Sequence, residues 1–84
     1  MNARPKKHSL TLKGHRTSVS LEDEFWEAFR NIAARQSKSI NVLAAQIDAE
    51  RTTGDDQIKS GLASAIRLFV LKYYQEAASR MPNG

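Results

Sequence analysis

The sequence contains no cysteine, a single tryptophan, two prolines and four glycines among its 84 residues. Without cysteine, neither a disulfide nor a thiolate metal site can stabilise the fold. No stretch approaches the roughly 20 consecutive apolar residues of a membrane span, and no apolar signal-peptide core follows the basic N-terminus. We therefore expect one small cytoplasmic domain with no membrane partner. A chain this short builds only a limited core, so we also expect it to form an oligomer with further copies of itself.

Acidic residues are absent from the first twenty positions, which hold five cations: Arg4, Lys6, Lys7, Lys13 and Arg16. The remaining 64 residues hold eight Lys or Arg and nine Asp or Glu, so the positive excess lies entirely at the N-terminus. A solubilising tail is one interpretation. A concentration of cations that leads directly into an alternating segment instead favours a polyanionic partner.

Arrangements of catalytic or metal-binding residues are also missing. The serines have no His and acid partners in a triad pattern, and no glycine-rich phosphate loop occurs. His8 and His15 lack further ligands at fixed spacing, and Asp55 and Asp56 lack the spacing of a calcium loop. The sequence therefore predicts no enzyme activity, no cofactor and no metal site.

The segment from Arg16 to Leu21 alternates strictly, which predicts a β-strand. Thr17, Val19 and Leu21, which are β-branched or apolar, should face a core. The alternate residues Arg16, Ser18 and Ser20 should face outward. No second strand of similar quality follows. A lone strand leaves backbone donors and acceptors unpaired, so this strand needs a partner.

The preceding residues leave two alternatives for that region. In residues 9–13 the apolar side chains occupy even positions, whereas they occupy odd positions after Lys13-Gly14. Such a change of phase at a glycine indicates a turn or a bulge. Residues 9–13 therefore either fold back as a hairpin on residues 15–19 or extend the strand past a bulge. We expect residues 1–8 to form a flexible basic arm, and we find no internal repeat.

Three helices are expected after the strand. The first should span residues 21–35, with Phe25, Phe29 and Ile32 on its buried face. The second should follow Ser39 as N-cap and end near residue 51. A polar loop at 52–56 precedes a third helix at 57–79, whose apolar stripe is widened by Leu68 and Leu71. This helix should contact more than one neighbour.

Two copies of the strand, paired antiparallel across a two-fold axis, would satisfy each other's backbone. The helices would cover the inner face, and Arg16, Ser18 and Ser20 would point outward. A two-stranded ribbon fits the major groove of B-DNA, where Arg can donate two hydrogen bonds to guanine and Ser discriminates less well. The strand therefore predicts a DNA-binding homodimer.

These residues resemble a known family. The run Arg16–Glu22, the apolar positions of the first helix, and the Ser39-Ile40-Asn41 start of the second helix are similar to ribbon-helix-helix proteins of the Arc/MetJ type. The similarity covers about residues 15–51. The runs Leu12–Glu22 and Ser64–Leu71 resemble, more narrowly, a group of short bacterial ribbon-helix-helix proteins that are presumed to bind DNA.

The resemblance implies a mostly helical fold with one short strand per chain, an intertwined homodimer with an intermolecular ribbon, and an extra C-terminal helix. The core would span residues 9–51, and the helix at 57–79 would pack on the dimer. Base contacts fall on Arg16, Ser18 and Ser20. Phosphate contacts are expected from the cations and from the start of the second helix: Arg4, Lys6, Lys7, Lys13, Ser39, Ile40 and Asn41.

The function predicted is that of a small bacterial transcriptional regulator, cytoplasmic and nucleoid-associated, whose partner is double-stranded DNA. The alternative is an antitoxin-like module that binds a protein partner through the C-terminal helix, with DNA binding weak or absent. The two differ in whether Leu68, Leu71 and Tyr74 are buried within a dimer or exposed as an apolar patch.

Overall fold

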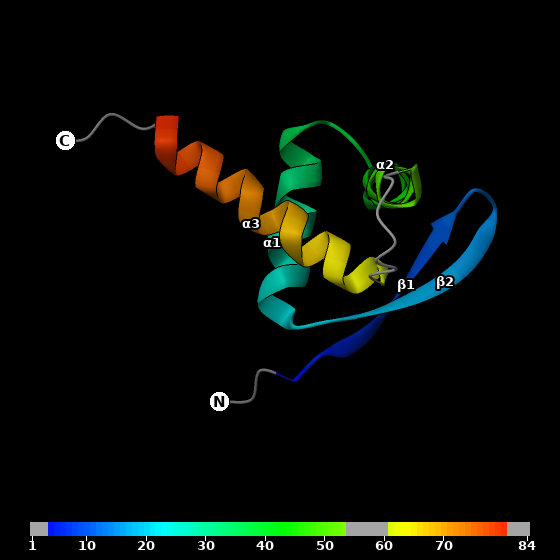
Figure 1. Ribbon diagram of the computed structural model, residues 1–84. Helices are drawn as coiled ribbons and strands as arrows, with labels where there is room; N and C mark the ends of the chain where they lie inside the picture. The colour runs from blue at the N-terminus through cyan, green and yellow to red at the C-terminus, as the bar shows by residue number, and fades with distance from the viewer. Residues whose placement is uncertain (1–3, 54–60, 81–84) are drawn as a thin grey trace.

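The computed structural model describes residues 4–53 and 61–80 of the chain. Two antiparallel strands are followed by three helices (Figure 1). The elements are β1 (Lys6–Leu12), β2 (His15–Leu21), α1 (Asp23–Arg35), α2 (Ile40–Thr53) and α3 (Leu62–Arg80).

The two strands form a hairpin, which is the first of the two alternatives that the change of phase left open. Leu12 pairs with His15, and the register continues outward from them along both strands. Lys13 and Gly14 form the turn, with φ of 52° and 79°. Two consecutive residues with positive φ give the turn whose twist matches a two-stranded ribbon, and glycine takes such a φ without steric cost. The bulge alternative is thereby excluded.

The ribbon expected between two chains is therefore formed within one. Each chain contributes two strands rather than one, and β1 occupies the place expected for the partner's strand. The physical reason is proximity, because closing a two-residue loop costs far less entropy than bringing two molecules together. β1 also begins at Lys6, so the ribbon includes residues 6–8 of the segment expected to be an arm.

The helices agree with the expected pattern, with small shifts at their ends. α1 begins at Asp23 rather than residue 21, and α2 continues to Thr53 rather than residue 51. α3 begins at Leu62, and residues 57–60 of its expected span lie outside the described residues. α1 ends where Ser37 takes a left-handed φ of 56° and the N–H of Lys38 donates to the carbonyl of Ala33 at 2.9 Å. This terminating turn redirects the chain into α2.

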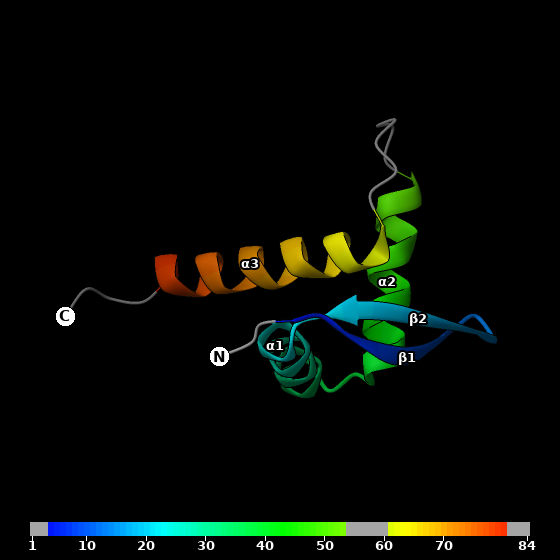
Figure 2. The same cartoon turned by 90° about the horizontal axis from the view of Figure 1, so that it is seen from below.

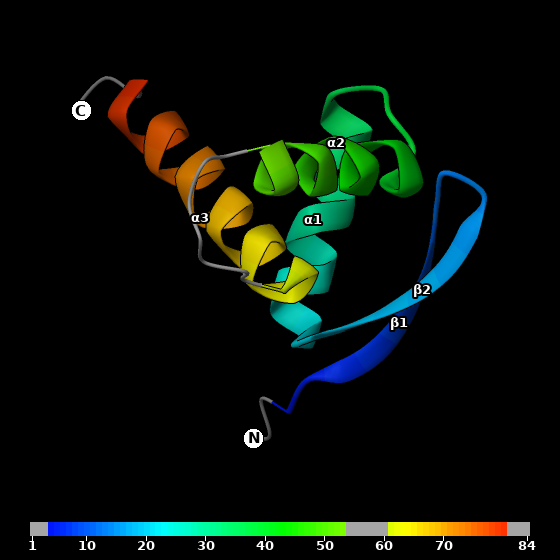
Figure 3. The same cartoon turned by 45° about the vertical axis from the view of Figure 1, so that its right-hand side comes forward.

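The core lies between the inner face of the ribbon and the helices. Leu10, Val19 and Leu21 contribute from the strands, and each is less than 5% exposed. α2 packs against β1 and α3 packs against β2, so each strand has its own helical neighbour (Figures 2 and 3). The helices complete the core with Phe29, Ile32, Ala33, Leu43, Ala44, Ile47, Ile66 and Val70.

Helix α3 has two different faces. Ile66 and Val70 are buried, whereas Leu68, Leu71 and Tyr74 are 55%, 51% and 41% exposed. Its C-terminal half extends away from the other elements (Figures 1 and 2). Within residues 4–53 and 61–80, no helix has the length and hydrophobicity required to cross a membrane.

Candidate nucleic-acid interface

The outer face of the ribbon is entirely solvent-exposed. Because side chains alternate along a strand, every second residue of each strand points away from the helices. We call these six residues the outer ribbon face: Lys7, Ser9 and Thr11 of β1, and Arg16, Ser18 and Ser20 of β2. The three residues predicted to contact bases lie together here, as the alternation of Arg16–Leu21 indicated. The role assigned to them remains a prediction.

The two strands also match each other in sequence, which the sequence analysis missed when it found no repeat. β1 reads KKHSLTL and β2 reads HRTSVSL. Aligned by position, the outer residues are a cation, a serine and a hydroxyl residue in both strands. Across the ribbon, Lys7 pairs with Ser20, Ser9 with Ser18, and Thr11 with Arg16. An approximate two-fold axis that relates the two strands therefore passes through the pair Ser9 and Ser18.

Two cations of the outer ribbon face have no partner among the described residues. Lys7 and Arg16 make neither an ion pair nor a hydrogen bond there. Lys6 instead pairs with Asp23 at 3.3 Å, and both side chains are more than 60% exposed. Such an exposed pair contributes little stability and exchanges readily with water. Arg4 and Lys13 are exposed, with Lys13 at the tip of the ribbon.

The start of α2, predicted to hold a phosphate, lies against the edge of β1. The Ser39 Oγ accepts the N–H of Val42 at 3.1 Å and so caps the helix. The Asn41 Oδ1 accepts the N–H of Thr11 at 3.0 Å. This contact fixes the helix end beside the ribbon and occupies the Asn41 carbonyl. Ile40 is half-buried.

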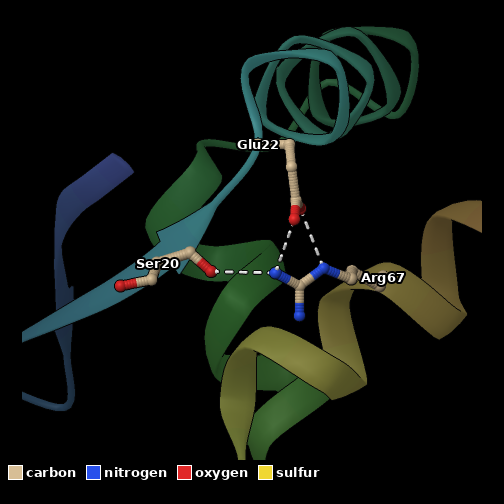
Figure 4. Close-up of polar contacts among 3 residues, drawn as sticks. All are labelled: Ser20, Glu22 and Arg67. Atoms are coloured by element: carbon tan, nitrogen blue, oxygen red, sulfur yellow. Dashed lines mark hydrogen bonds and ion pairs between the residues drawn. The ribbon is translucent and has the colours of Figure 1, made fainter. Parts of the chain in front are cut away.

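Arg67 of α3 joins this helix to the end of β2, and the sequence analysis did not single it out. Its Nε donates to Glu22 Oε1 at 2.9 Å, and its Nη2 donates to Glu22 Oε2 at 3.3 Å (Figure 4). Nη2 also donates to the carbonyl of Ser20 at 3.3 Å. The guanidinium lies 5.9 Å from the centre of the Phe25 ring. The available signal was an arginine within the apolar run 66–71.

The Arg67 contact changes the acidity of its partner. The hydrogen bond from Arg67, assisted by its charge, lowers the pKa of Glu22 from the ordinary value of 4.5. The charge of Glu22 therefore persists to lower pH than that of an unpaired glutamate, and the ionised carboxylate holds α3 against the β2–α1 junction. We call the contacts of Arg67 with Glu22 and Ser20 the Arg67 clamp. This clamp also holds the backbone carbonyl of Ser20 pointing outward from the ribbon edge.

His8 has a packing role on the inner side of the ribbon. Its ring stacks on Trp26, with centroids 4.1 Å apart and planes 9° from parallel. Its Nε2 is buried without a hydrogen-bond partner in the described part of the chain. Residues 4–53 and 61–80 contain no group of three or more His, Cys, Asp or Glu that could hold a metal ion.

Comparison with known proteins identifies the fold. The model of the ribbon-helix-helix domain matches residues 5–74, which is most of the chain. The chain belongs to the ribbon-helix-helix family. Among solved structures, it is similar to an uncharacterized protein from Bordetella pertussis Tohama I, with 28% identity and a TM-score of 0.72. That match covers 95% of this chain.

The ribbon-helix-helix chain spans 64% of the length of that structural relative. The relative's name assigns it no activity. No curated protein matches the chain. The matched segment includes β1 as well as β2, so the family similarity covers both strands of the ribbon.

Proposed function

We propose that this ribbon-helix-helix protein is a small bacterial transcriptional regulator that inserts its ribbon into the major groove of DNA. The observation that carries the proposal is the outer ribbon face, which is exposed along its whole length and bears Lys7 and Arg16, two cations that are unpaired among residues 4–53 and 61–80. A two-stranded ribbon has the width that the major groove admits.

The chemistry of this face suits a duplex. Arg16 can donate two hydrogen bonds to guanine, and the hydroxyl groups can donate to or accept from base edges. Lys7 on this face, together with Arg4, Lys6 and Lys13 beside it, provides phosphate contacts. The N-terminus of α2, at Ser39–Asn41, provides backbone N–H groups and the positive end of a helix dipole beside β1. These assignments follow the resemblance and the placement of the residues.

The experiment is a titration of a mixed-sequence duplex at two salt concentrations. If about four cations neutralise phosphates, raising salt from about 50 to 200 mM should weaken binding on the order of a hundredfold. Arg16→Ala should weaken binding by about tenfold through the loss of its base contact. Affinity that does not change with salt would contradict the proposal.

The exposed side of α3 supports a second candidate function. Leu68, Leu71 and Tyr74, which we call the outer α3 face, are about half exposed although they are large and apolar. An apolar patch on an extended helix suits contact with another protein, either a second copy of this chain or a partner that the chain binds as an antitoxin-like module. The homodimer would then form through α3, because the ribbon is already complete within one chain.

Sedimentation of the wild-type protein and of the double variant Leu68→Ser, Leu71→Ser tests this second candidate. A wild-type dimer that becomes a monomer in the variant, with DNA binding per chain retained, would support self-association through α3. A wild-type monomer at all concentrations would contradict self-association and restrict the surface to a different partner.

A further inference from the structure

The matching strands assign a complete, approximately two-fold symmetric reading surface to a single chain. We infer that β1 reads DNA in the same way as β2, so that Lys7, Ser9 and Thr11 are specificity residues equivalent to Arg16, Ser18 and Ser20. This inference rests on the proposed DNA-binding function and deepens it. It assigns base contacts to a strand from which only the phosphate contacts of Lys6 and Lys7 were expected.

The register carries the first part of the argument. Rotating the ribbon about the pair Ser9 and Ser18 places Lys7 on Arg16 and Thr11 on Ser20. All six side chains are exposed on one face. A duplex in the groove would therefore meet a cation, a serine and a hydroxyl residue in the same order from each strand. A side chain on β1 has the same access to bases as its counterpart on β2.

The hydrogen bonds at the two edges carry the second part. The N–H of Thr11 points outward to Asn41 of α2, and the carbonyl of Ser20 points outward to Arg67 of α3. These two positions are themselves related by the approximate two-fold axis. A helix therefore holds the outer edge of each strand at the equivalent residue. Neither strand is a mobile arm, and both are fixed for recognition before DNA binds.

The dimensions indicate the size of the target. The outer residues of one strand span four residue steps, or about 14 Å at about 3.4 Å per residue. With the flanking cations this corresponds to about six base pairs at about 3.4 Å each. The target should be a short, nearly palindromic sequence. Its two halves should differ where arginine, which favours bidentate contact with guanine, is replaced by lysine.

A designed disulfide tests whether the ribbon forms within one chain in solution. Ser9 and Ser18 lie in the same alternation as Thr11 and Ser20, whose backbone groups point outward, so they face each other as a non-hydrogen-bonded pair. The Cα atoms of such a pair are about 4.5 Å apart, within the range of a disulfide. Because the chain has no cysteine, Ser9→Cys with Ser18→Cys introduces the only two thiols.

The expected result is an oxidised protein that migrates as a single chain without reductant, with both thiols blocked. Single variants with one thiol are the control for random collision. A covalent dimer in the double variant, at a yield well above the controls, would overturn the inference. Wild-type DNA binding would survive that outcome, because a ribbon made by two chains could still enter the groove.

A matched pair of alanine variants tests the equivalence of the strands. Duplexes selected from a random pool by the wild-type protein are titrated with Lys7→Ala, Arg16→Ala and the control Lys72→Ala. Lys72 is an exposed cation on α3, away from the ribbon. We expect Lys7→Ala and Arg16→Ala each to weaken binding by about tenfold and each to relax the preference at one half of the site, and Lys72→Ala to have less than about a twofold effect.

Two outcomes distinguish a failure of this inference from a failure of the proposed DNA-binding function. If Arg16→Ala weakens binding and Lys7→Ala does not, β1 is not a reading strand, and the inference fails while DNA binding stands. If the wild-type protein binds no duplex at low salt, both fail. Native mass spectrometry on a selected duplex of about 16 base pairs adds a count of chains. A single bound chain, or a bound dimer that the double variant Leu68→Ser, Leu71→Ser converts to a single bound chain, would support the inference. A bound dimer that persists in that variant would overturn it.

Discussion

The outer ribbon face and the outer α3 face are both exposed, yet they differ in chemistry. The ribbon presents hydroxyl groups and cations, whereas α3 presents Leu68, Leu71 and Tyr74. Polar, cationic side chains remain hydrated in the free protein and exchange water for phosphates and bases on binding. Apolar side chains gain free energy by leaving water. The two surfaces therefore suit two kinds of partner.

Arg67 links the two regions physically. It belongs to α3 but donates to Glu22 and to the carbonyl of Ser20, at the end of a strand of the outer ribbon face. A contact that displaced α3 would release this end of β2. Substitutions on one side of an element, with matched substitutions on its other side, therefore distinguish the roles of the two faces.

The largest effect is expected from a charge placed on the inner side of β2. Val19 is 4% exposed, so Val19→Asp buries an unpaired carboxylate and should cost about 3 kcal/mol or more, enough to unfold a small domain. The neighbouring Ser18→Asp places the same charge on the outer side and should cost less than about 1 kcal/mol. Thermal unfolding followed by circular dichroism measures both. Equal losses would contradict the assigned phase of the strand.

The second-largest effect is a difference in unfolding free energy between substitutions on the buried and exposed faces of α3. Ile66 is fully buried, and Ile66→Ala should lower the free energy of unfolding by about 2–4 kcal/mol through lost burial and a cavity. Leu68 is 55% exposed, and Leu68→Ala should change it by about 0.5 kcal/mol or less in the monomer. Denaturant titration at low protein concentration gives both values. A large loss for Leu68→Ala that grows with protein concentration would place Leu68 in an interface.

Substitutions on the ribbon should weaken DNA binding more than substitutions on α3. Ser18→Asp sets a negative charge at the centre of the outer ribbon face and should weaken duplex binding by about tenfold or more, equivalent to about 1.4 kcal/mol. Leu71→Ser, on the outer α3 face, should leave it within about twofold. Fluorescence anisotropy at fixed salt compares the two. A stronger effect of Leu71→Ser would indicate that DNA binding depends on assembly through α3.

The smallest effect concerns the clamp between the two regions. Because Arg67 lowers the pKa of Glu22, the folded state holds fewer protons at this carboxylate than the unfolded state. The contribution is complete above the ordinary value of 4.5 and is lost as pH falls through the lowered pKa. Wild-type stability should therefore exceed that of Glu22→Gln at about pH 6, and the difference should shrink toward about pH 3.

The control for the clamp is Glu24→Gln, which removes an exposed acid from the same first turn of α1. Glu24 makes no ion pair among the described residues. Chemical denaturation at several pH values provides the measurement. If both variants show the same pH dependence, the helix dipole rather than Arg67 stabilises the charge.

Much of the fold was predictable because local patterns dictate it. The alternation of Arg16–Leu21 placed Val19 inside and Ser18 outside, and the helical spacing of Phe25, Phe29 and Ile32 placed α1. These predictions hold because burial of apolar side chains fixes the phase of a strand and the face of a helix. The change of phase at Lys13-Gly14 also located the turn, but it did not choose between a hairpin and a bulge.

The partner of β2 could not be read from the sequence, because backbone hydrogen bonds carry no side-chain identity and any strand edge can satisfy another. The tertiary structure chose β1 of the same chain, and it brought Arg67, which follows α2 in the sequence, to Glu22 and Ser20. Local sequence patterns alone dictate which residues face outward and where the positive charge lies. Only the folded chain decided that two strands share that outer face, since their pairing depends on how close the folded backbone brings them.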